Sequence, residues 1–255
     1  MILYQYNTKV EWMNPDGAYF LSDDMQFASY LLNSQMFSTE VNIINKLHSE
    51  FKDIASDKIF VDIGASFGTY TLILGQIFKH TYAFEPDIHT YNILCGNIAM
   101  HNLSDKTTLI NAPVSDKIEN VNYVKLDSLG GCNYCYTETD NIAKMYSQYT
   151  PQSILSKQAI TIDSLNLTNI GLLKIDVEGF ELRVLKGCVR SLEASNYPPF
   201  IIESWQVYDA ESPEVKMEKQ QLRKELFEFI QNELQYSIIQ VGEDIFYCKK
   251  IETVG

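Results

Sequence analysis

The chain has 255 residues, 45% of them hydrophobic, and a formal net charge of −13. This length is enough for one large α/β domain with a sizeable core. The acidic balance argues against a general DNA-binding protein, because such proteins bind phosphates through excess lysine and arginine. With no run of 18 apolar residues, we expect no insertion into a membrane.

The N-terminus lacks the basic start and the long apolar stretch of a signal peptide. The five cysteines are an odd number, which favours reduced thiols and a cytoplasmic location. Cys132 and Cys135 form a lone CxxC without a second ligand pair, so we interpret them as loop cysteines rather than a zinc site.

We interpret residues 1–37 as an N-terminal extension that caps the substrate, and residues 38–255 as the main domain. The domain begins with a helix over Ser38–Phe51, where apolar residues recur at helical spacing. Further helices are expected at Thr69–Phe78, Asp87–Asn102, Glu178–Leu192 and about Pro213–Leu234. The expected strands are Lys58–Ile63, Thr81–Glu85, Thr107–Val114, Gly171–Val177, Phe200–Ser204, Tyr236–Val241 and Ile245–Lys249.

Strands that alternate with helices indicate a parallel sheet with right-handed crossovers. The last two strands are joined tightly by residues 242–244, so they form an antiparallel hairpin. The sequence therefore predicts an α/β fold of the class I methyltransferase (Rossmann-like) type. It has a mainly parallel seven-stranded sheet, a C-terminal antiparallel hairpin and helices on both faces.

The segment IFVDIGASFGTY at residues 59–70 is typical of a strand, glycine turn and helix that bind a nucleotide cofactor. Asp62 would hold the loop or a cofactor amine, and Gly64 and Gly68 let the backbone pass close to a ligand. Glu85 ends the next strand, where an acid accepts hydrogen bonds from ribose hydroxyls.

S-adenosylmethionine fits this loop better than other cofactors do. A dinucleotide turn wants glycine where Ser66 stands, and a P-loop needs a lysine that is absent. S-adenosylmethionine has a ribose and a cationic tail but no phosphate, which suits carboxylates.

A long insert, residues 115–158, interrupts the alternation of strands and helices. Loops of this length are usually functional or mobile, and this one follows the third strand on the substrate side. Its tyrosines at 123, 134, 136, 146 and 149 either form a stacking wall for a ligand or pack the loop onto the domain.

The second motif is LLKIDVEGFELRVLKG at residues 172–187. Lys174 and Asp176 alternate onto one face of a strand. Glu178 opens the next helix, where the helix dipole favours an acid, and Glu203 ends a neighbouring strand. Three carboxylates at neighbouring strand ends can hold a divalent cation or supply a general base.

With the ITIDSL segment at 160–165 and FIIE at 200–203, these motifs resemble the FkbM family of S-adenosylmethionine-dependent methyltransferases over about residues 38–250. The resemblance implies a class I methyltransferase fold and O-methylation of sugars or polyketide-type metabolites. The family loop usually reads Gly-Ala-Asn-x-Gly, so Ser66 replaces an asparagine. The predicted cofactor-binding residues are Asp62, Gly64, Ala65, Ser66, Gly68, Glu85, Pro86, Ser115 and Asp116.

We expect direct methyl transfer to a hydroxyl group of a sugar, glycan or small metabolite. Asp176 is the first candidate for general base or metal ligand, with Glu178, Glu203 and Lys174 in support. The alternatives are a 2′-hydroxyl of RNA, which would use Lys174 as the base, an NAD-dependent oxidoreductase or epimerase, and a catalytically silent binding module. The sequence does not specify the acceptor or the oligomeric state.

Overall fold

A computed structural model describes residues 2–5, 19–22, 35–126, 132–147, 149–209 and 211–251. The chain divides into two compact units, Met1–Asn111 and Ala112–Gly255. Most of the predicted N-terminal cap, residues 1–37, lies outside the described residues, so its role stays a prediction.

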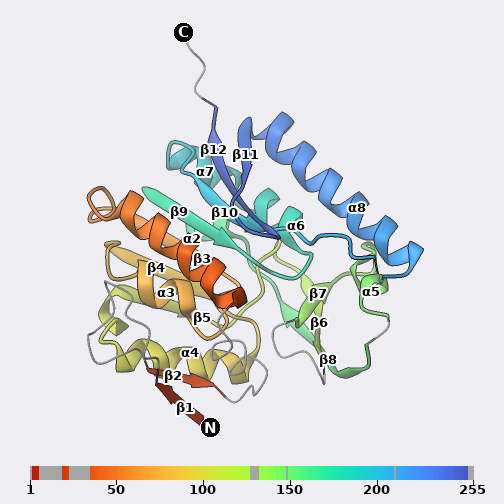
Figure 1. The fold of residues 1–255 in the computed structure, drawn as a ribbon, viewed down its shortest axis with the longest axis horizontal. Helices are drawn as coiled ribbons and strands as arrows, with labels where there is room; N and C mark the ends of the chain where they lie inside the picture. The colour runs from red at the N-terminus through yellow and green to blue at the C-terminus, as the bar shows by residue number, and fades with distance from the viewer. Residues whose placement is uncertain are drawn as a thin grey trace. The chain divides into compact units, whose positions relative to one another are not determined.

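The first unit contains three parallel strands with helices between them (Figure 1). A short antiparallel pair, β1 (Ile2–Gln5) and β2 (Tyr19–Ser22), comes first along the chain. The other elements are α2 (Gln35–Phe51), β3 (Ile59–Ile63), α3 (Thr69–Leu74), β4 (His80–Phe84), α4 (Ile88–Met100), a 3-10 turn (Ser104–Lys106) and β5 (Thr107–Ile110).

Capping and apolar packing fix these elements. Asp87 begins α4 because its carboxylate accepts hydrogen bonds from the backbone N–H groups of His89 and Thr90. Burial of Leu72 on α3, Ala83 on β4 and side chains of α4 joins the helices to the strands in one apolar cluster. This packing holds the ends of β3 and β4, where the glycine turn begins.

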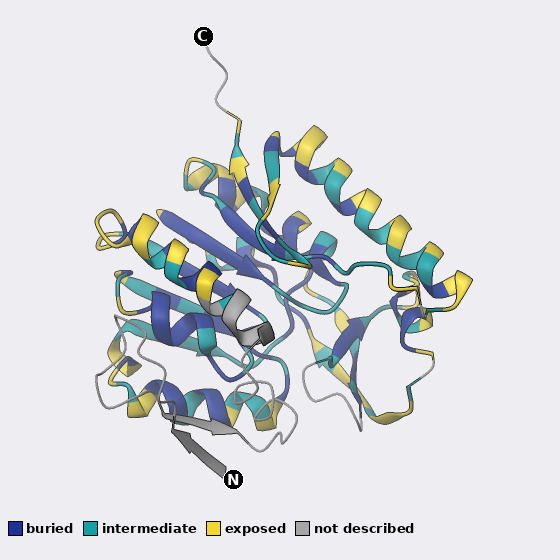
Figure 2. Ribbon diagram, viewed as in Figure 1, coloured by how far each residue is buried: buried dark blue, intermediate teal, exposed yellow. Residues whose placement is uncertain are grey.

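The second unit carries the other strands of the main sheet. Its elements are β9 (Ile170–Ile175), α6 (Glu181–Lys186), α7 (Val189–Ala194), β10 (Phe200–Glu203), α8 (Pro213–Glu228), a π-helical turn (Phe229–Glu233), β11 (Tyr236–Gln240) and β12 (Ile245–Lys250). Strands β9 and β10 are parallel, whereas β12 is antiparallel to both β10 and β11. Figure 2 shows β9 as a buried strand, and each of its residues is buried.

The strand order of the seven-stranded sheet is β11-β12-β10-β9-β3-β4-β5. The predicted fold is confirmed: the sheet is mainly parallel and ends in an antiparallel hairpin. Among the described helices, none combines the length and the apolar character needed to cross a membrane.

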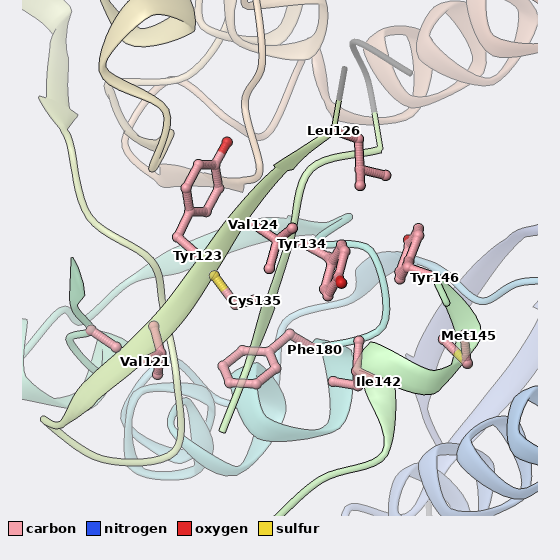
Figure 3. Packing of buried hydrophobic residues seen from close by; sticks show 11 residues of the cluster. Val121, Tyr123, Val124, Leu126, Tyr134, Cys135, Ile142, Met145, Tyr146 and Phe180 are labelled. Carbon is pink, nitrogen blue, oxygen red and sulfur yellow. The ribbon is translucent and has the colours of Figure 1, made fainter. Parts of the chain in front are cut away.

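The predicted insert at residues 115–158 has secondary structure that its sequence did not signal. This part of the second unit forms an antiparallel sheet in the order β7-β6-β8, from β6 (Asn120–Leu126), β7 (Tyr134–Tyr136) and β8 (Pro151–Gln158), with a short helix α5 (Ile142–Met145). Val121 and Tyr134 of the insert pack with Phe180, the residue before α6, in one apolar cluster (Figure 3).

Backbone hydrogen bonds hold the two ends of the insert together. Ser115 N–H donates to Ile160 O at 2.8 Å, and Ala159 N–H donates to Glu119 O at 2.8 Å. Val114 and Ile160 form a parallel bridge. The chain thus leaves and rejoins the unit at neighbouring points.

Other predicted boundaries also differ from the structure. Helix α3 ends at Leu74 instead of Phe78, and α8 ends at Glu228, where a π-helical turn follows. The expected helix Glu178–Leu192 is two helices, α6 and α7, and it begins at Glu181 rather than at Glu178. Glu178 and Gly179 have φ angles of 56° and 98°, outside the helical region, so they form a turn before α6. The dipole of α6 therefore does not explain why an acid stands at position 178. Strand β5 ends at Ile110 instead of Val114.

Candidate active site

The glycine turn of the first unit follows β3 as predicted. Gly64 and Ala65 donate their backbone N–H groups to Phe84 O at 3.0 and 2.9 Å, which ties the turn to the end of β4. Gly68 has a φ of 98°, and a Cβ atom there would lie 2.7 Å from the Leu94 side chain. Only glycine meets both conditions at this position.

Glu85 is held against the glycine turn. Its carboxylate accepts hydrogen bonds from the Ser66 N–H at 3.0 Å and the Asp87 N–H at 2.8 Å. Ser66 has a φ of 51°, a left-handed conformation that is uncommon for residues other than glycine and asparagine. The structure therefore brings two predicted cofactor residues, Ser66 and Glu85, into direct contact.

Asp62 is fully buried at the end of β3. Its carboxylate accepts a hydrogen bond from the Thr71 hydroxyl at 2.5 Å, which fixes the first turn of α3. Of the two roles predicted for Asp62, the structure shows the one that holds the loop. Binding of a cofactor amine by Asp62 stays a prediction.

Two asparagines with structural roles at this turn were missed in the sequence analysis. Asn111 donates its side-chain amide to Glu85 O at 2.8 Å and to Pro86 O at 3.0 Å, which fixes the backbone after β4. Asn97, buried on α4, donates to Phe67 O at 2.8 Å within the glycine turn. Nothing in the local sequence of either residue signals these contacts.

Ser115 and Asp116 have partners within the second unit. Ser115 is fully buried, and a Cβ atom on Gly187 would lie 2.1 Å from its carbonyl oxygen. Asp116 accepts a hydrogen bond from the Arg183 guanidinium at 2.8 Å. These contacts explain the glycine that ends the VLKG segment, whereas the adenine-binding role of both residues stays a prediction.

The ITIDSL segment also has a structural role. Asp163 accepts hydrogen bonds from the backbone N–H groups of Arg190 at 3.1 Å and Ser191 at 2.8 Å. It thereby satisfies N–H groups at the start of α7 that have no partner inside the helix.

Three carboxylates of the second unit gather at the ends of two parallel strands. Lys174 pairs with Ile201 across β9 and β10, and this register brings the residues that follow β9 beside the end of β10. One carboxylate oxygen from each of Asp176, Glu178 and Glu203 lies within 4.8 Å of the others. The structure thus confirms that the predicted trio is a spatial cluster.

The buried Lys174 side chain lies beside this cluster. Its ammonium group is 3.0 Å from Asp176 Oδ2, and its side chain is only 7% exposed against 33% for Asp176. Burial alone would raise the pKa of Asp176, but the Lys174 charge and hydrogen bonds from Glu203 and Lys174 outweigh burial and lower it. Asp176 is therefore ionised at neutral pH.

Glu203 and Glu178 are shifted in the other direction. Burial, followed by the charges of Asp176 and Glu178, raises the pKa of Glu203 well above its ordinary value, and Glu203 shares a hydrogen bond with Asp176. Burial and the Asp176 charge raise the pKa of Glu178 to about 8. The pKa values of the trio are thus driven apart, with that of Asp176 lowered and those of Glu178 and Glu203 raised.

The spacing of the three carboxylates would let them hold a divalent cation, because one oxygen of each lies within 4.8 Å of the others. The Lys174 ammonium group, 3.0 Å from Asp176 Oδ2, already supplies a positive charge at this place. The pair leaves a partly exposed carboxylate, Asp176, at the end of β9.

The tyrosines of the insert serve mainly as packing. Tyr123, Tyr134 and Tyr146 are at most 7% exposed within the apolar cluster, whereas Tyr136 and Tyr149 are half-buried at its edge. The sequence alone did not decide whether these tyrosines stack on a ligand or pack the insert. Their burial favours packing for Tyr123, Tyr134 and Tyr146.

A mainly parallel seven-stranded sheet that ends in an antiparallel hairpin is the fold of a class I methyltransferase. The model of the methyltransferase FkbM domain matches residues 62–238, more than half of the chain, so the chain belongs to the FkbM methyltransferase family. The resemblance seen in the sequence is thereby confirmed, and an oxidoreductase is set aside. No curated protein matches the chain.

Three solved structures are similar to this chain. An SAH-bound methyltransferase from Podospora anserina has a TM-score of 0.50 and 9% identity, with 82% of this chain and 78% of that chain covered. The methyltransferase FkbM from Methylobacillus flagellatus KT has a TM-score of 0.49 and 14% identity over 90% of this chain, which spans 56% of that one. A putative caffeoyl-CoA O-methyltransferase from Staphylococcus aureus has a TM-score of 0.49 and 10% identity, with coverages of 88% and 99%.

Proposed function

We propose that this chain is an S-adenosylmethionine-dependent O-methyltransferase that acts on a hydroxyl group of a sugar, glycan or small metabolite. The observation that carries the proposal is the ionised, partly exposed Asp176 at the end of β9, paired with the buried Lys174. Family membership supplies the reaction class, and Asp176 supplies an ionised carboxylate that can accept a proton.

The glycine turn of the first unit fits S-adenosylmethionine by its charge. Residues 62–70 contain a carboxylate but no lysine or arginine that would bind phosphate. Gly64 and Gly68 carry no side chain at the two ends of the turn, and Glu85 is fixed by backbone N–H groups for contact with ribose hydroxyls. S-adenosylmethionine would supply an electrophilic methyl group on a sulfonium.

Asp176 would accept the proton of the acceptor hydroxyl as its oxygen forms a bond to the methyl carbon. The electron pair of the breaking carbon–sulfur bond stays on sulfur, so the cofactor leaves as a neutral thioether. Lys174 keeps Asp176 ionised before the transfer. Glu203, as a hydrogen-bond donor to Asp176, orients its carboxylate.

An RNA 2′-hydroxyl acceptor receives less support from these contacts. That reading uses Lys174 as a base, which requires a neutral and accessible amine. Lys174 is ion-paired with Asp176, and its side chain is 7% exposed. The cytoplasmic location stays a prediction based on the cysteine count.

The test begins with calorimetric titration of the purified chain with S-adenosylmethionine, with NAD as a control ligand. Tritium transfer from methyl-labelled S-adenosylmethionine to a panel of methyl glycosides and phenols then measures activity. We expect Asp176→Asn, which keeps the shape of the side chain, to lower transfer about 100-fold or more and to leave cofactor affinity within a few-fold.

Glu193→Gln is the matched control, because it removes the charge of an exposed acid on α7. It should leave both affinity and transfer unchanged. An equal loss of affinity and transfer in Asp176→Asn would make Asp176 a cofactor ligand instead of the base. Binding of NAD alone would overturn the proposed function.

A further inference from the structure

Glu178 is held in a strained backbone conformation. Its φ of 56° places a glutamate in the left-handed region, which costs about 1–2 kcal/mol for residues with a Cβ atom. Strain of this kind persists only where the surroundings fix the residue, and it is concentrated at functional sites. The groups that fix Glu178 are therefore of interest.

The strongest of these contacts comes from the insert. The Tyr146 hydroxyl, just after α5, donates a hydrogen bond to Glu178 Oε2 at 2.8 Å. The two residues are 32 positions apart in the sequence. The contact thus joins the insert to the turn that carries the catalytic carboxylates.

The Tyr146 ring has little freedom to move. It stacks on Tyr134 with centroids 4.0 Å apart and planes 6° from parallel, and its edge meets Trp205 at 5.6 Å. Figure 3 shows Tyr134 and Tyr146 side by side in the apolar cluster. Because both neighbours fix the ring, the hydroxyl is directed at one place.

Other charged and titratable groups also face Glu178. The Asp176 and Glu181 charges disfavour its ionised form, whereas hydrogen bonds from Tyr146 and Trp205 favour it. The Cys132 thiol is hydrogen-bonded to Glu178 as well. Cys132 and Tyr146 both belong to the insert, so the insert meets this carboxyl group at two points.

We propose that Tyr146 is a positioning residue for methyl transfer, because its hydroxyl holds the Glu178 carboxyl group in one orientation beside Asp176. The inference rests on the proposed function and deepens it. The insert then contributes to the catalytic unit itself, in addition to any contact it makes with the acceptor.

The test compares Tyr146→Phe with Tyr134→Phe in the full chain. Tyr146→Phe keeps the stacked ring and removes only the hydroxyl that reaches Glu178. Tyr134→Phe removes a hydroxyl from the other ring of the same stack, so it is a matched control for packing. Equal melting temperatures of the two variants would show that each one folds.

The readout is the side-chain carboxyl resonance of Glu178 in protein labelled with ¹³C at glutamate Cδ, assigned with Glu178→Gln. The wild type should titrate near the pKa of about 8. Tyr146→Phe should raise the midpoint by about one pH unit, because it removes a hydrogen bond to the ionised form. Tyr134→Phe should leave the midpoint unchanged.

Binding of S-adenosylmethionine is measured on the same samples. Methyl transfer is measured on them as well. Unchanged cofactor affinity, together with a midpoint shift and a loss of methyl transfer in Tyr146→Phe alone, supports the proposal. An unchanged midpoint in Tyr146→Phe overturns it, and so does an equal shift in Tyr134→Phe, which would assign the effect to packing. If Tyr146→Phe shifts the midpoint but the wild type binds no S-adenosylmethionine, the proposed function is overturned and only the Tyr146–Glu178 contact remains.

Discussion

Replacing Arg183 with methionine should destabilise the second unit markedly. The Arg183 guanidinium donates to Asp116 at 2.8 Å and to Glu119 at 3.0 Å, and its Nε lies 3.7 Å from Asp140. It also donates to the Thr137 hydroxyl at 2.9 Å. This one side chain on α6 therefore holds two segments of the insert, residues 116–119 and residues 137–140.

The magnitude follows from these contacts and from exposure. Hydrogen bonds to charged groups contribute about 1.5–3 kcal/mol each, and they are not additive. Removal of one partner from a buried ion pair costs about 3–5 kcal/mol, which we discount because the Arg183 side chain is 19% exposed. Arg183→Met, which keeps much of the alkyl chain, should therefore lower the free energy of unfolding by about 3 kcal/mol.

Urea denaturation followed by circular dichroism measures this loss. In a chain of this size it corresponds to a fall in melting temperature of about 6–12 °C. Arg190→Met is the matched control, because its ion pair with Asp163 involves a side chain that is 74% exposed. Such pairs contribute about 0–1 kcal/mol. A loss in Arg183→Met no larger than in Arg190→Met would refute the reasoning.

Three further predictions concern the turns and the carboxylates. Gly187→Ala should lower the free energy of unfolding by about 2 kcal/mol or more in urea melts, since its Cβ would lie 2.1 Å from Ser115 O; an unchanged unfolding midpoint would contradict this. Ser66→Val should lower the free energy of unfolding by about 1–2 kcal/mol and weaken S-adenosylmethionine binding in calorimetry, because a β-branched residue is disfavoured at a φ of 51°. Ser66→Gly should bind the cofactor as the wild type does. Removal of divalent metals with a chelator should leave methyl transfer unchanged, because the Lys174 ammonium group, 3.0 Å from Asp176 Oδ2, already balances the Asp176 charge; activity that returns only with added Mg²⁺ would make the trio a metal site.

The main sheet could be predicted from the sequence because its signals are local. Apolar runs such as the one in β9 end in acids, and the glycine turn follows β3 directly. Parallel strands present their carboxyl ends at the same edge, so Asp176 and Glu203 could be placed together without a structure. The same reasoning located Glu85.

The insert could not be predicted because its pairing is not visible in its pattern. Strand β8 has no buried side chain, so it lacks the alternation of apolar and polar residues that identifies a strand. Strand β7 has only three residues. Their pairing with β6 depends on contacts between distant segments.

The backbone conformation of Glu178 could not be predicted from the sequence either. A positive φ at a residue other than glycine or asparagine has no sequence signal, so a helix start was the natural interpretation. The partners of Glu178 are also remote, since Tyr146 precedes it by 32 positions. The contact between Tyr146 and Glu178 could be recognised only from the structure.

The closed base of the insert has a consequence for protein engineering. Ala159 N–H donates a hydrogen bond of 2.8 Å to Glu119 O, so the segment between these residues begins and ends at neighbouring points of the second unit. Segments of different length can be grafted between these two residues without stretching the strands that flank them. If Tyr146 positions Glu178 as we propose, a graft that changes the acceptor must also carry a tyrosine able to reach Glu178.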